Sequence, residues 1–175
     1  MIRKLCFLLV LFSMSSMSHA YDWYVGASGH YLQDKILSAN FKPGGIGALV
    51  GAYIKPKVGV ELYAMTGLNP YDDDVDINLE HSYSVGALVR LESPETESGG
   101  KMFVKLGYGT TELNMDRSGT GEPGKDSFTG FTYGGGVEFN LCKSDRYYVS
   151  LDAMSYYSRN DISIGGASLG FRYRF

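Results

Sequence analysis

Two of the three histidines, His30 and His81, are the side chains of this 175-residue chain best suited to acid–base or nucleophilic chemistry. A histidine can activate a serine hydroxyl when the two side chains come within hydrogen-bond reach. Ser82 follows His81, but adjacent strand residues point to opposite faces, so these two cannot pair with each other. The same alternation predicts that His81 points outward. A serine from another strand could still serve, but we expect both histidines to be polar residues at strand ends and expect no catalytic residue.

An acidic segment over 72–80 is the second feature that could do chemistry. Asp72, Asp74 and Asp76 alternate along it and would share one face of an extended chain. Carboxylates bind calcium, but an EF-hand loop needs Gly at its sixth and Glu at its twelfth position. Counted from Asp72, those positions hold Ile77 and Tyr83, so the segment is not an EF-hand. A solvated acidic loop and a weak divalent-ion site that bridges it to anionic groups both stay open.

The remaining motifs that could hold a cofactor are incomplete. Gly124-Lys125 is followed by Asp126 and a strand pattern, whereas a phosphate-binding loop needs Ser or Thr and then a helix. Cys142 is the one cysteine beyond residue 20 and reads as a free thiol. The net charge is −3 and no basic stripe is present. We therefore expect no cofactor, no metal and no nucleic-acid partner.

The first twenty residues have the pattern of a secretory signal peptide. Arg3 and Lys4 precede an apolar run over 5–12, and small residues end the segment at Ala20. The run is shorter than the roughly 20 residues that a membrane-spanning helix needs. We predict cleavage after Ala20. The exported domain over 21–175 then has a net charge of −5, because two of the 16 basic and none of the 19 acidic residues are removed.

Beyond residue 20, apolar residues alternate with small or polar ones in eight stretches separated by Gly, Pro, Asp, Asn and Ser. Period two indicates strands, and stretches of about ten residues suit tilted strands that span a bilayer. The apolar positions are Trp23, Val25, Ala27; Ile46, Ala48, Val50, Ala52, Ile54; Val58, Val60, Leu62, Ala64; Tyr83, Val85, Ala87, Val89, Leu91; Met102, Val104, Leu106, Tyr108; Phe131, Tyr133, Val137, Phe139, Leu141; Tyr147, Val149, Leu151, Ala153, Tyr157; and Ala167, Leu169, Phe171, Tyr173, Phe175.

The residues between these apolar positions indicate which way the strands face. They are mainly Gly and Ser, with few charges. A solvent-facing sheet would carry more Lys, Glu and Thr, whereas the interior of an eight-stranded barrel is only wide enough for side chains to fill. We predict an all-β fold, an eight-stranded antiparallel up-and-down transmembrane β-barrel whose apolar face points into lipid. A soluble lipocalin-like barrel is the alternative.

Six charged residues share the inward phase and belong to different predicted strands. Buried ions cost several kcal/mol each unless they are paired. We therefore expect them to pair across the lumen and plug it, with an ion path as the alternative. Inward aromatic residues, Tyr53, Tyr63, Phe103 and Tyr148, add bulk. The charged set is Glu61, Arg90, Lys105, Glu138, Asp152 and Arg172.

Aromatic residues and connection lengths predict the orientation. The connections at 55–57, 92–100 and 142–146 are short or moderate, and they alternate with those at 32–43, 67–79, 112–127 and 158–163. Short periplasmic turns and longer outer loops are typical of membrane barrels, as are aromatic girdles at both interfaces. One predicted girdle is Trp23, Phe139, Tyr147, Tyr173 and Phe175, and the other is Tyr83, Tyr108, Phe131 and Tyr157.

The last nine residues, ASLGFRYRF, alternate apolar side chains up to the terminal Phe175. With this strand, the whole sequence beyond residue 20 resembles the OmpA/OmpX-type family of small outer-membrane β-barrels. The resemblance implies that Phe171, Tyr173 and Phe175 form the signal read by the barrel assembly machinery, after delivery by periplasmic chaperones. It also implies contact with outer-membrane lipid and lipopolysaccharide, and a lumenal salt-bridge network. No peptidoglycan-binding domain follows, so cell-wall tethering is not expected.

From this resemblance we expect a non-enzymatic outer-membrane protein whose outer loops serve envelope integrity, adhesion or contact with a host or surface ligand. Two alternatives stay open. A lipid A deacylase or acyltransferase would use His81 at the height of the outer leaflet. A small ion channel or porin would use the lumenal charges.

Overall fold

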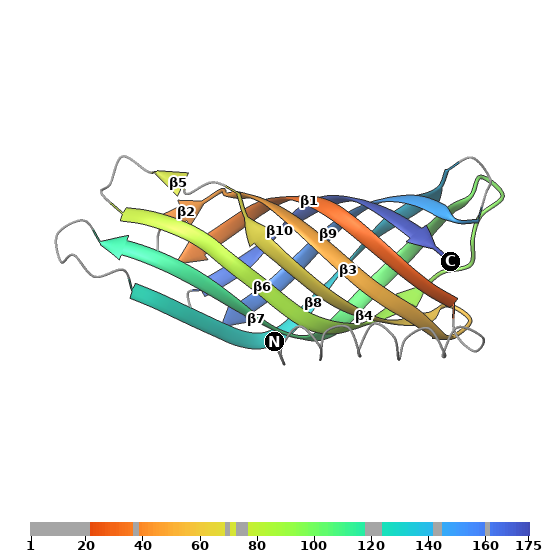
Figure 1. Ribbon diagram of the computed structural model, residues 1–175, viewed down its shortest axis with the longest axis horizontal. Helices are drawn as coiled ribbons and strands as arrows, with labels where there is room; N and C mark the ends of the chain where they lie inside the picture. Colours follow the sequence, from red (N-terminus) through yellow and green to blue (C-terminus); the bar gives the residue numbers. More distant parts are fainter. Residues whose placement is uncertain are drawn as a thin grey trace, which may run out of the picture.

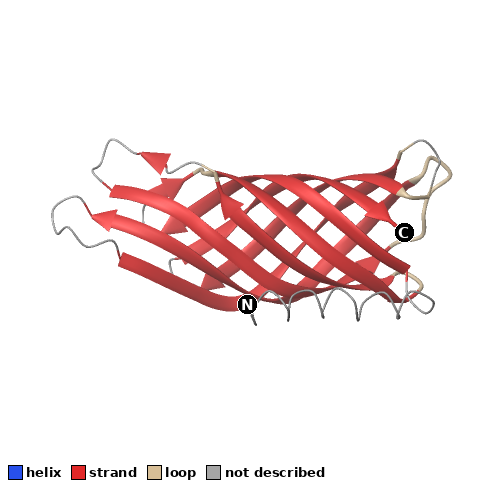
Figure 2. Cartoon of the chain, viewed as in Figure 1, coloured by secondary structure: helices blue, strands red, loops and turns tan. Residues whose placement is uncertain are grey.

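The computed structural model describes residues 22–36, 39–68, 71–72, 77–117, 124–141, 145–159 and 162–175, which form one sheet closed into a barrel (Figure 1). The alternating and β-branched residues of these stretches favour extended backbone. Figure 2 shows the strands inclined to the long axis, as barrel closure requires. The strands are β1 (Asp22–Ile36), β2 (Ala39–Phe41), β3 (Gly44–Lys55), β4 (Val58–Gly67), β5 (Tyr71–Asp72), β6 (Ile77–Glu92), β7 (Gly100–Arg117), β8 (Gly124–Asn140), β9 (Tyr147–Arg159) and β10 (Ile162–Arg174).

Eight of these strands form the wall in the order β1, β3, β4, β6, β7, β8, β9, β10, each antiparallel to its neighbours. β10 returns to β1 with Tyr24 opposite Arg174 and Ile36 opposite Ile162, which closes the ladder. β2 and β5 are short strands that pair with β1 and β6. The predicted eight-stranded antiparallel barrel is confirmed.

The barrel has a terminal end and a loop end. The terminal end holds the start of β1 and the end of β10, with the turns at 56–57 and 93–99 and the adjacent ends of β8 and β9. The loop end holds the last residues of β1, β4, β7 and β9 and the first residues of β3, β6, β8 and β10. Among the described residues, no helix is long and apolar enough to cross a membrane.

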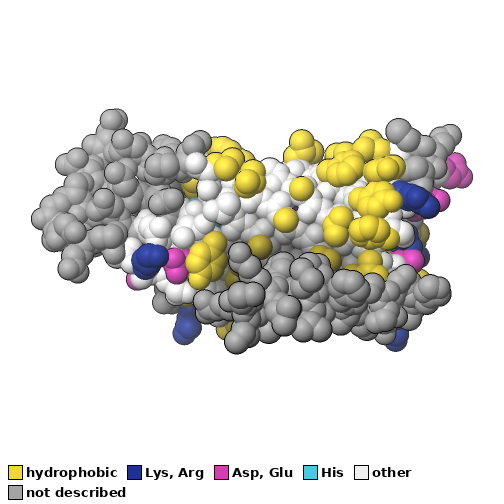
Figure 3. Space-filling view, viewed as in Figure 1, with side chains coloured by type: hydrophobic (Ala, Val, Ile, Leu, Met, Phe, Trp, Pro, Cys, Tyr) yellow, Lys and Arg dark blue, Asp and Glu magenta, His cyan; other side chains and the backbone are white. Residues whose placement is uncertain are grey.

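Side chains alternate between the lumen and the outer surface, because successive residues of a pleated strand point to opposite faces. On β4, Val60 and Leu62 are 40% and 60% exposed, while Glu61 between them is 2% exposed. Figure 3 shows apolar side chains gathered on the outer surface toward the terminal end. An exposed apolar surface of this extent belongs against lipid rather than water.

Two register shifts near the loop end interrupt this alternation. The β6–β7 pairing shifts between His81 and Tyr83, so His81 points into the lumen and is 1% exposed. The β9–β10 pairing shifts at Ile164/Gly165, so Tyr157 packs against the apolar cluster of the lumen. The predictions that His81 and Tyr157 face outward are therefore wrong, because a bulge adds one residue and reverses the phase of the strand beyond it.

Strands β6, β7 and β8 project past the ends of β9 and β10 at the loop end (Figure 1). The β7–β8 ladder continues to Met115 opposite Gly124, inside the segment 112–127 that the sequence assigned to a loop. Antiparallel pairing satisfies the backbone N–H and C=O groups of both strands whether their side chains are polar or apolar. The strands therefore continue through this polar segment. The ladder from β8 to β9 begins at Tyr133, opposite Ser155. Residues 124–131 therefore pair through β7 alone among the described strands.

Candidate functional site

Eight charged side chains fill the lumen toward the terminal end. They come from six wall strands, and each is at most 8% exposed. Four are acidic and four are basic, so the set is electrically neutral when all are ionised. We call this set the charge layer: Glu61, Arg90, Glu92, Lys101, Lys105, Glu138, Asp152 and Arg172.

Arg90, on β6, is the centre of the charge layer. Its Nε lies 2.6 Å from Glu92 Oε1, and its Nη2 lies 2.9 Å from Glu138 Oε2. Its Nη1 lies 3.5 Å from Glu61 Oε1. The guanidinium also lies 3.8 Å from the centre of the Phe103 ring, in cation–π geometry. Because a guanidinium has five donors in one plane, Arg90 joins β4, β6 and β8 across the lumen.

Arg172 and Lys101 close the layer on the side of the chain termini. Arg172 donates to Glu138 and lies 3.4 Å from Glu92 Oε1. Lys101 Nζ lies 2.8 Å from Glu92 Oε2 and 3.2 Å from Glu138 Oε1. Tyr53 donates to Glu92 at 2.5 Å. Glu138 and Glu92 are thus each surrounded by three cations, which offsets the cost of burying the carboxylates.

Lys105 extends the layer toward the middle of the barrel. Its Nζ lies 3.2 Å from Glu61 Oε2 and 3.3 Å from Asp152 Oδ2. Ser168 donates to the other oxygen of Asp152, and Tyr24 donates to Glu61 at 3.1 Å. Every acid of the layer therefore has a cationic partner, and Glu61, Glu92 and Asp152 also accept a hydrogen bond from a hydroxyl group.

The six charged residues expected in the lumen lie together in this layer, and the sequence reasoning missed two further members. Glu92 and Lys101 border the segment 92–100 that was assigned to a connection. Glu92 has the phase of Arg90, and Lys101 has the phase of Lys105. That parity was the signal that could have found them.

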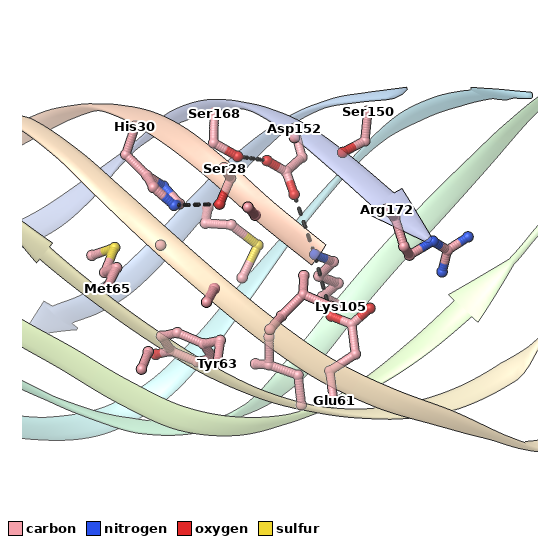
Figure 4. Close-up of a pocket in the computed structure, with 18 of the residues that line it drawn as sticks. Ser28, His30, Glu61, Tyr63, Met65, Lys105, Ser150, Asp152, Ser168 and Arg172 are labelled. Atoms are coloured by element: carbon pink, nitrogen blue, oxygen red, sulfur yellow. Dashed lines mark hydrogen bonds and ion pairs between the residues drawn. The ribbon is translucent and has the colours of Figure 1, made fainter. Parts of the chain in front are cut away.

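A cavity of about 50 Å³, lined by both charged and apolar side chains, extends from the charge layer toward the loop end (Figure 4). His30 lines it, with Nε2 2.8 Å from Ser28 Oγ and Nδ1 3.3 Å from the Tyr156 hydroxyl. Asp152 and Ser168 face it from β9 and β10. One water needs about 10–15 Å³ by this measure, so the cavity has room for a few waters and for no larger solute.

An apolar layer fills the lumen next to this cavity, toward the loop end. Leu32, Leu113 and Ile164 are 0% exposed. An apolar constriction opposes ion passage, because an ion would have to shed its water there without gaining a partner. The members of the layer are Leu32, Met65, Leu88, Leu113, Met154, Tyr156 and Ile164.

A chain of four polar side chains lies beside the apolar layer, where the β6 bulge turns His81 inward. His81 Nδ1 lies 3.3 Å from Asp34 Oδ2, and its Nε2 lies 2.9 Å from Ser84 Oγ. Ser84 Oγ lies 2.6 Å from Thr111 Oγ1. All four residues are at most 1% exposed. The sequence reasoning missed this chain, which we call the Asp34–His81 array, because strict alternation hides a bulge.

The connectivity of the array is that of an Asp–His–Ser triad. A nucleophile must reach its substrate, however, and Ser84 is 0% exposed and also bonded to Thr111. His30 points into the lumen as well. Neither histidine faces lipid, so the observation that motivated a lipid A modifying enzyme is corrected. Within the described parts of the chain, no three His, Cys, Asp or Glu side chains converge as metal ligands.

The residues of the expected assembly signal lie on the outer surface of β10 and just beyond it. Phe171 and Phe175 are 46% and 70% exposed, and the Tyr173 ring lies 5.1 Å from that of Phe175. Asp74, Asp76, Cys142 and the segment 1–20 are outside the described residues, as is the side chain of Asp72 in β5.

Comparisons with known proteins agree with this architecture. The family model described as "Outer membrane protein beta-barrel domain" matches residues 5–175. The structure of Ail from Yersinia pestis, in complex with the heparin analogue sucrose octasulfate, is 20% identical and covers 89% of this chain and 99% of its own, with a TM-score of 0.65. Neisserial surface protein A (NspA) is 18% identical over 87% of this chain and 97% of its own, with a TM-score of 0.66.

The outer membrane protein OprG from Pseudomonas aeruginosa is 13% identical over 90% of this chain and 97% of its own, with a TM-score of 0.61. A comparison with curated protein sequences gives no match. At these identities the likeness shows the fold: the same closed barrel as in transmembrane outer-membrane proteins.

Proposed function

Because the chain belongs to the outer membrane protein beta-barrel domain family, we propose that it is a non-enzymatic integral outer-membrane protein that presents its loop end to the outside. Its role is contact with a host or surface ligand, in adhesion or envelope integrity. The filled lumen supports this proposal, since it leaves no room for a substrate larger than a few waters.

The observation that carries the proposal is the sheet that projects from the loop end. Residues 124–131 of β8 have no described ladder partner on the β9 side. Unpaired strand edges are templates for another strand, and many recognition domains bind extended segments in this way. Lys125 and Asp126, both exposed, sit on this edge and would add charge selectivity.

The net charge of the outer segments limits the chemical class of ligand that they can bind. The segments 33–43, 68–80, 112–127 and 158–163 hold eleven acidic and five basic residues, a net charge of −6. Like charges repel, so a sulfated ligand such as the one bound by Ail is disfavoured for this chain. We propose a partner with basic or neutral groups. Lipopolysaccharide phosphates would be bound through divalent ions at Asp72, Asp74 and Asp76.

The two ends of the sequence bear on export and assembly. We propose that residues 1–20 are removed as a signal peptide and that 21–175 is the mature barrel domain. Periplasmic chaperones and the assembly machinery would then deliver it, with Phe171, Tyr173 and Phe175 as the recognised strand. Intact-mass measurement of protein from outer membranes should give a chain that begins at Tyr21, and retention of residues 1–20 would contradict this.

The test of adhesion exchanges the loops. Residues 73–76 and 118–123 would be replaced separately by Gly-Ser segments of equal length, and cells that display each variant would be tested for binding to host cells and to basic proteins. Binding should fall in one or both variants. The matched control replaces residues 95–98 at the terminal end and should bind normally. Unchanged binding in both loop variants, at equal surface expression, would contradict the adhesion role.

A small channel is the second candidate, supported by the lumenal cavity that charge-layer residues line. Planar-bilayer recordings decide between the two. Conductance in the intact protein, or in a Glu138→Ala variant that unbalances the charge layer, would support a channel. Silent recordings from both would leave the loop-based role.

A further inference from the structure

The Asp34–His81 array joins strands that are not neighbours. Asp34 lies on β1, His81 and Ser84 lie on β6, and Thr111 lies on β7. β3 and β4 separate β1 from β6 in the sheet. The contact between Asp34 and His81 therefore crosses the lumen, close to the loop that follows β1 and the loop that precedes β6.

The array can take up a proton without losing a hydrogen bond. With a neutral imidazole that carries its proton on Nδ1, His81 donates to Asp34, and Nε2 accepts from Ser84. With a charged imidazole, Nε2 donates to Ser84, and the Ser84 hydroxyl then donates to Thr111. Hydroxyl groups both donate and accept, so the serine–threonine pair simply reverses direction.

The two protonation states differ in net charge. The imidazolium cancels the carboxylate of Asp34, whereas the neutral imidazole leaves one buried negative charge. His81 supplies the one ion pair that the described residues give Asp34, and Asp34 Oδ1 has no hydrogen-bond partner among them. A buried charge without a counter-ion is costly, so the protonated form holds the two strands together more firmly.

The described side chains next to the array supply no competing counter-ion. The cross-strand neighbours of the array are apolar: Leu113 of β7 lies opposite His81, and Ile164 of β10 lies opposite Asp34. Gly67 of β4 lies against His81. The titratable groups that face this part of the lumen among the described side chains are His30, Tyr63 and Tyr156, with Lys105 and Asp152 of the charge layer beyond them.

We propose that the Asp34–His81 array is a proton-operated brace across the loop end of the barrel. While His81 carries its proton, the brace ties β1 to β6 and β7 and keeps the lumen closed. Loss of the proton leaves the buried Asp34 carboxylate without a counter-ion beside outer segments whose net charge, without Asp34 itself, is −5, and this loosens the loop end. Histidine is the side chain that ordinarily changes charge between pH 5 and 8, so the brace responds to changes in external pH.

Nuclear magnetic resonance of the full barrel in lipid nanodiscs tests the brace, because His30 and His81 are the only histidines beyond residue 20. A His30→Gln variant assigns the two sets of ring signals. Between pH 5 and 9, the His81 ring signals should move, and the amide signals of Lys35, Ser84 and Thr111 should move with the same midpoint. Exchange of these amides, corrected for intrinsic rates, should be roughly tenfold faster or more above the midpoint, as expected when the ion pair between His81 and Asp34 weakens to a hydrogen bond from a neutral ring.

Two variants and one control test whether the pH dependence arises from the contact between Asp34 and His81. Asp34→Asn should keep the His81 ring neutral down to pH 5, and His81→Gln should abolish the pH dependence of amide exchange at Lys35. His30→Gln, which changes the other lumenal imidazole, should leave that dependence intact. The amides of Val25 and Val60, toward the terminal end, should not respond.

The wild-type titration decides the matter even if a variant fails to fold. A His81 ring that does not titrate, or that titrates without a change at Lys35, Ser84 and Thr111, overturns the brace. Labelling of Ser84 by a fluorophosphonate also overturns it, since that reaction needs an exposed, activated hydroxyl.

Discussion

Replacement of Glu138 by Gln is the sharpest test of the charge layer. Glu138 is 1% exposed and touches three cations: Arg90 at 2.9 Å, Lys101 at 3.2 Å and Arg172. The substitution keeps the shape of the side chain and leaves four positive charges facing three negative ones. Removal of one partner of a buried ion pair costs about 3–5 kcal/mol, because the remaining charge is buried without compensation. We expect a loss of that size in the free energy of unfolding.

The assay is guanidinium unfolding in lipid vesicles, with the mobility of unheated samples on gels as the measure of folded protein. Glu97→Gln, in the exposed turn at the terminal end, is the matched control and should change stability by no more than about 0.5 kcal/mol. Adding Lys101→Gln to Glu138→Gln restores neutrality and should recover about 1 kcal/mol or more. Two results would refute the reasoning. One is a Glu138→Gln barrel as stable as the wild type. The other is a double variant whose loss in unfolding free energy exceeds the two single-variant losses added together.

Three further outcomes are expected from the packing. Gly107→Ala should destabilise the barrel by about 1–3 kcal/mol, because the added Cβ would lie 2.0 Å from the Ala87 carbonyl oxygen, whereas Gly29→Ala meets nothing within 4 Å and should be neutral in the same unfolding assay. Leu113→Ala should cost about 2–5 kcal/mol, since Leu113 is fully buried in the apolar layer; a loss below about 1 kcal/mol would mean that this layer is not close-packed. Phe175→Ala removes an exposed side chain and should leave unfolding stability nearly unchanged while lowering the amount of barrel assembled in cells, measured by unheated gel mobility; equal assembly would remove Phe175 from the recognised strand.

The regular part of the fold could be predicted from alternation. A strand shows its two faces in the sequence itself, since odd and even residues point opposite ways. The apolar positions from Val60 and Leu62 to Leu169 and Phe171 are exposed on the outer surface. The inward phase of Glu61 and Arg90 followed from the same count. Within a regular strand, the face of each side chain depends only on its position along the chain, so the sequence alone gives it.

The projecting strands could not be predicted in this way. Residues 112–127 have the composition of a loop, yet β7 and β8 pair there as far as Met115 and Gly124. A ladder continues as long as two arms stay in register, which depends on the partner strand rather than on the polarity of either one.

The sequence by itself determined that the chain is a β-barrel, which face of each strand is apolar, and which charges share the interior. Only the tertiary structure decided that Glu92 and Lys101 complete the charge layer and that His81 meets Asp34 and Ser84. The physical reason is that parity assigns a side chain to a face, whereas a bulge resets the parity and closure of the barrel selects which faces meet. Both depend on contacts between strands far apart in the chain.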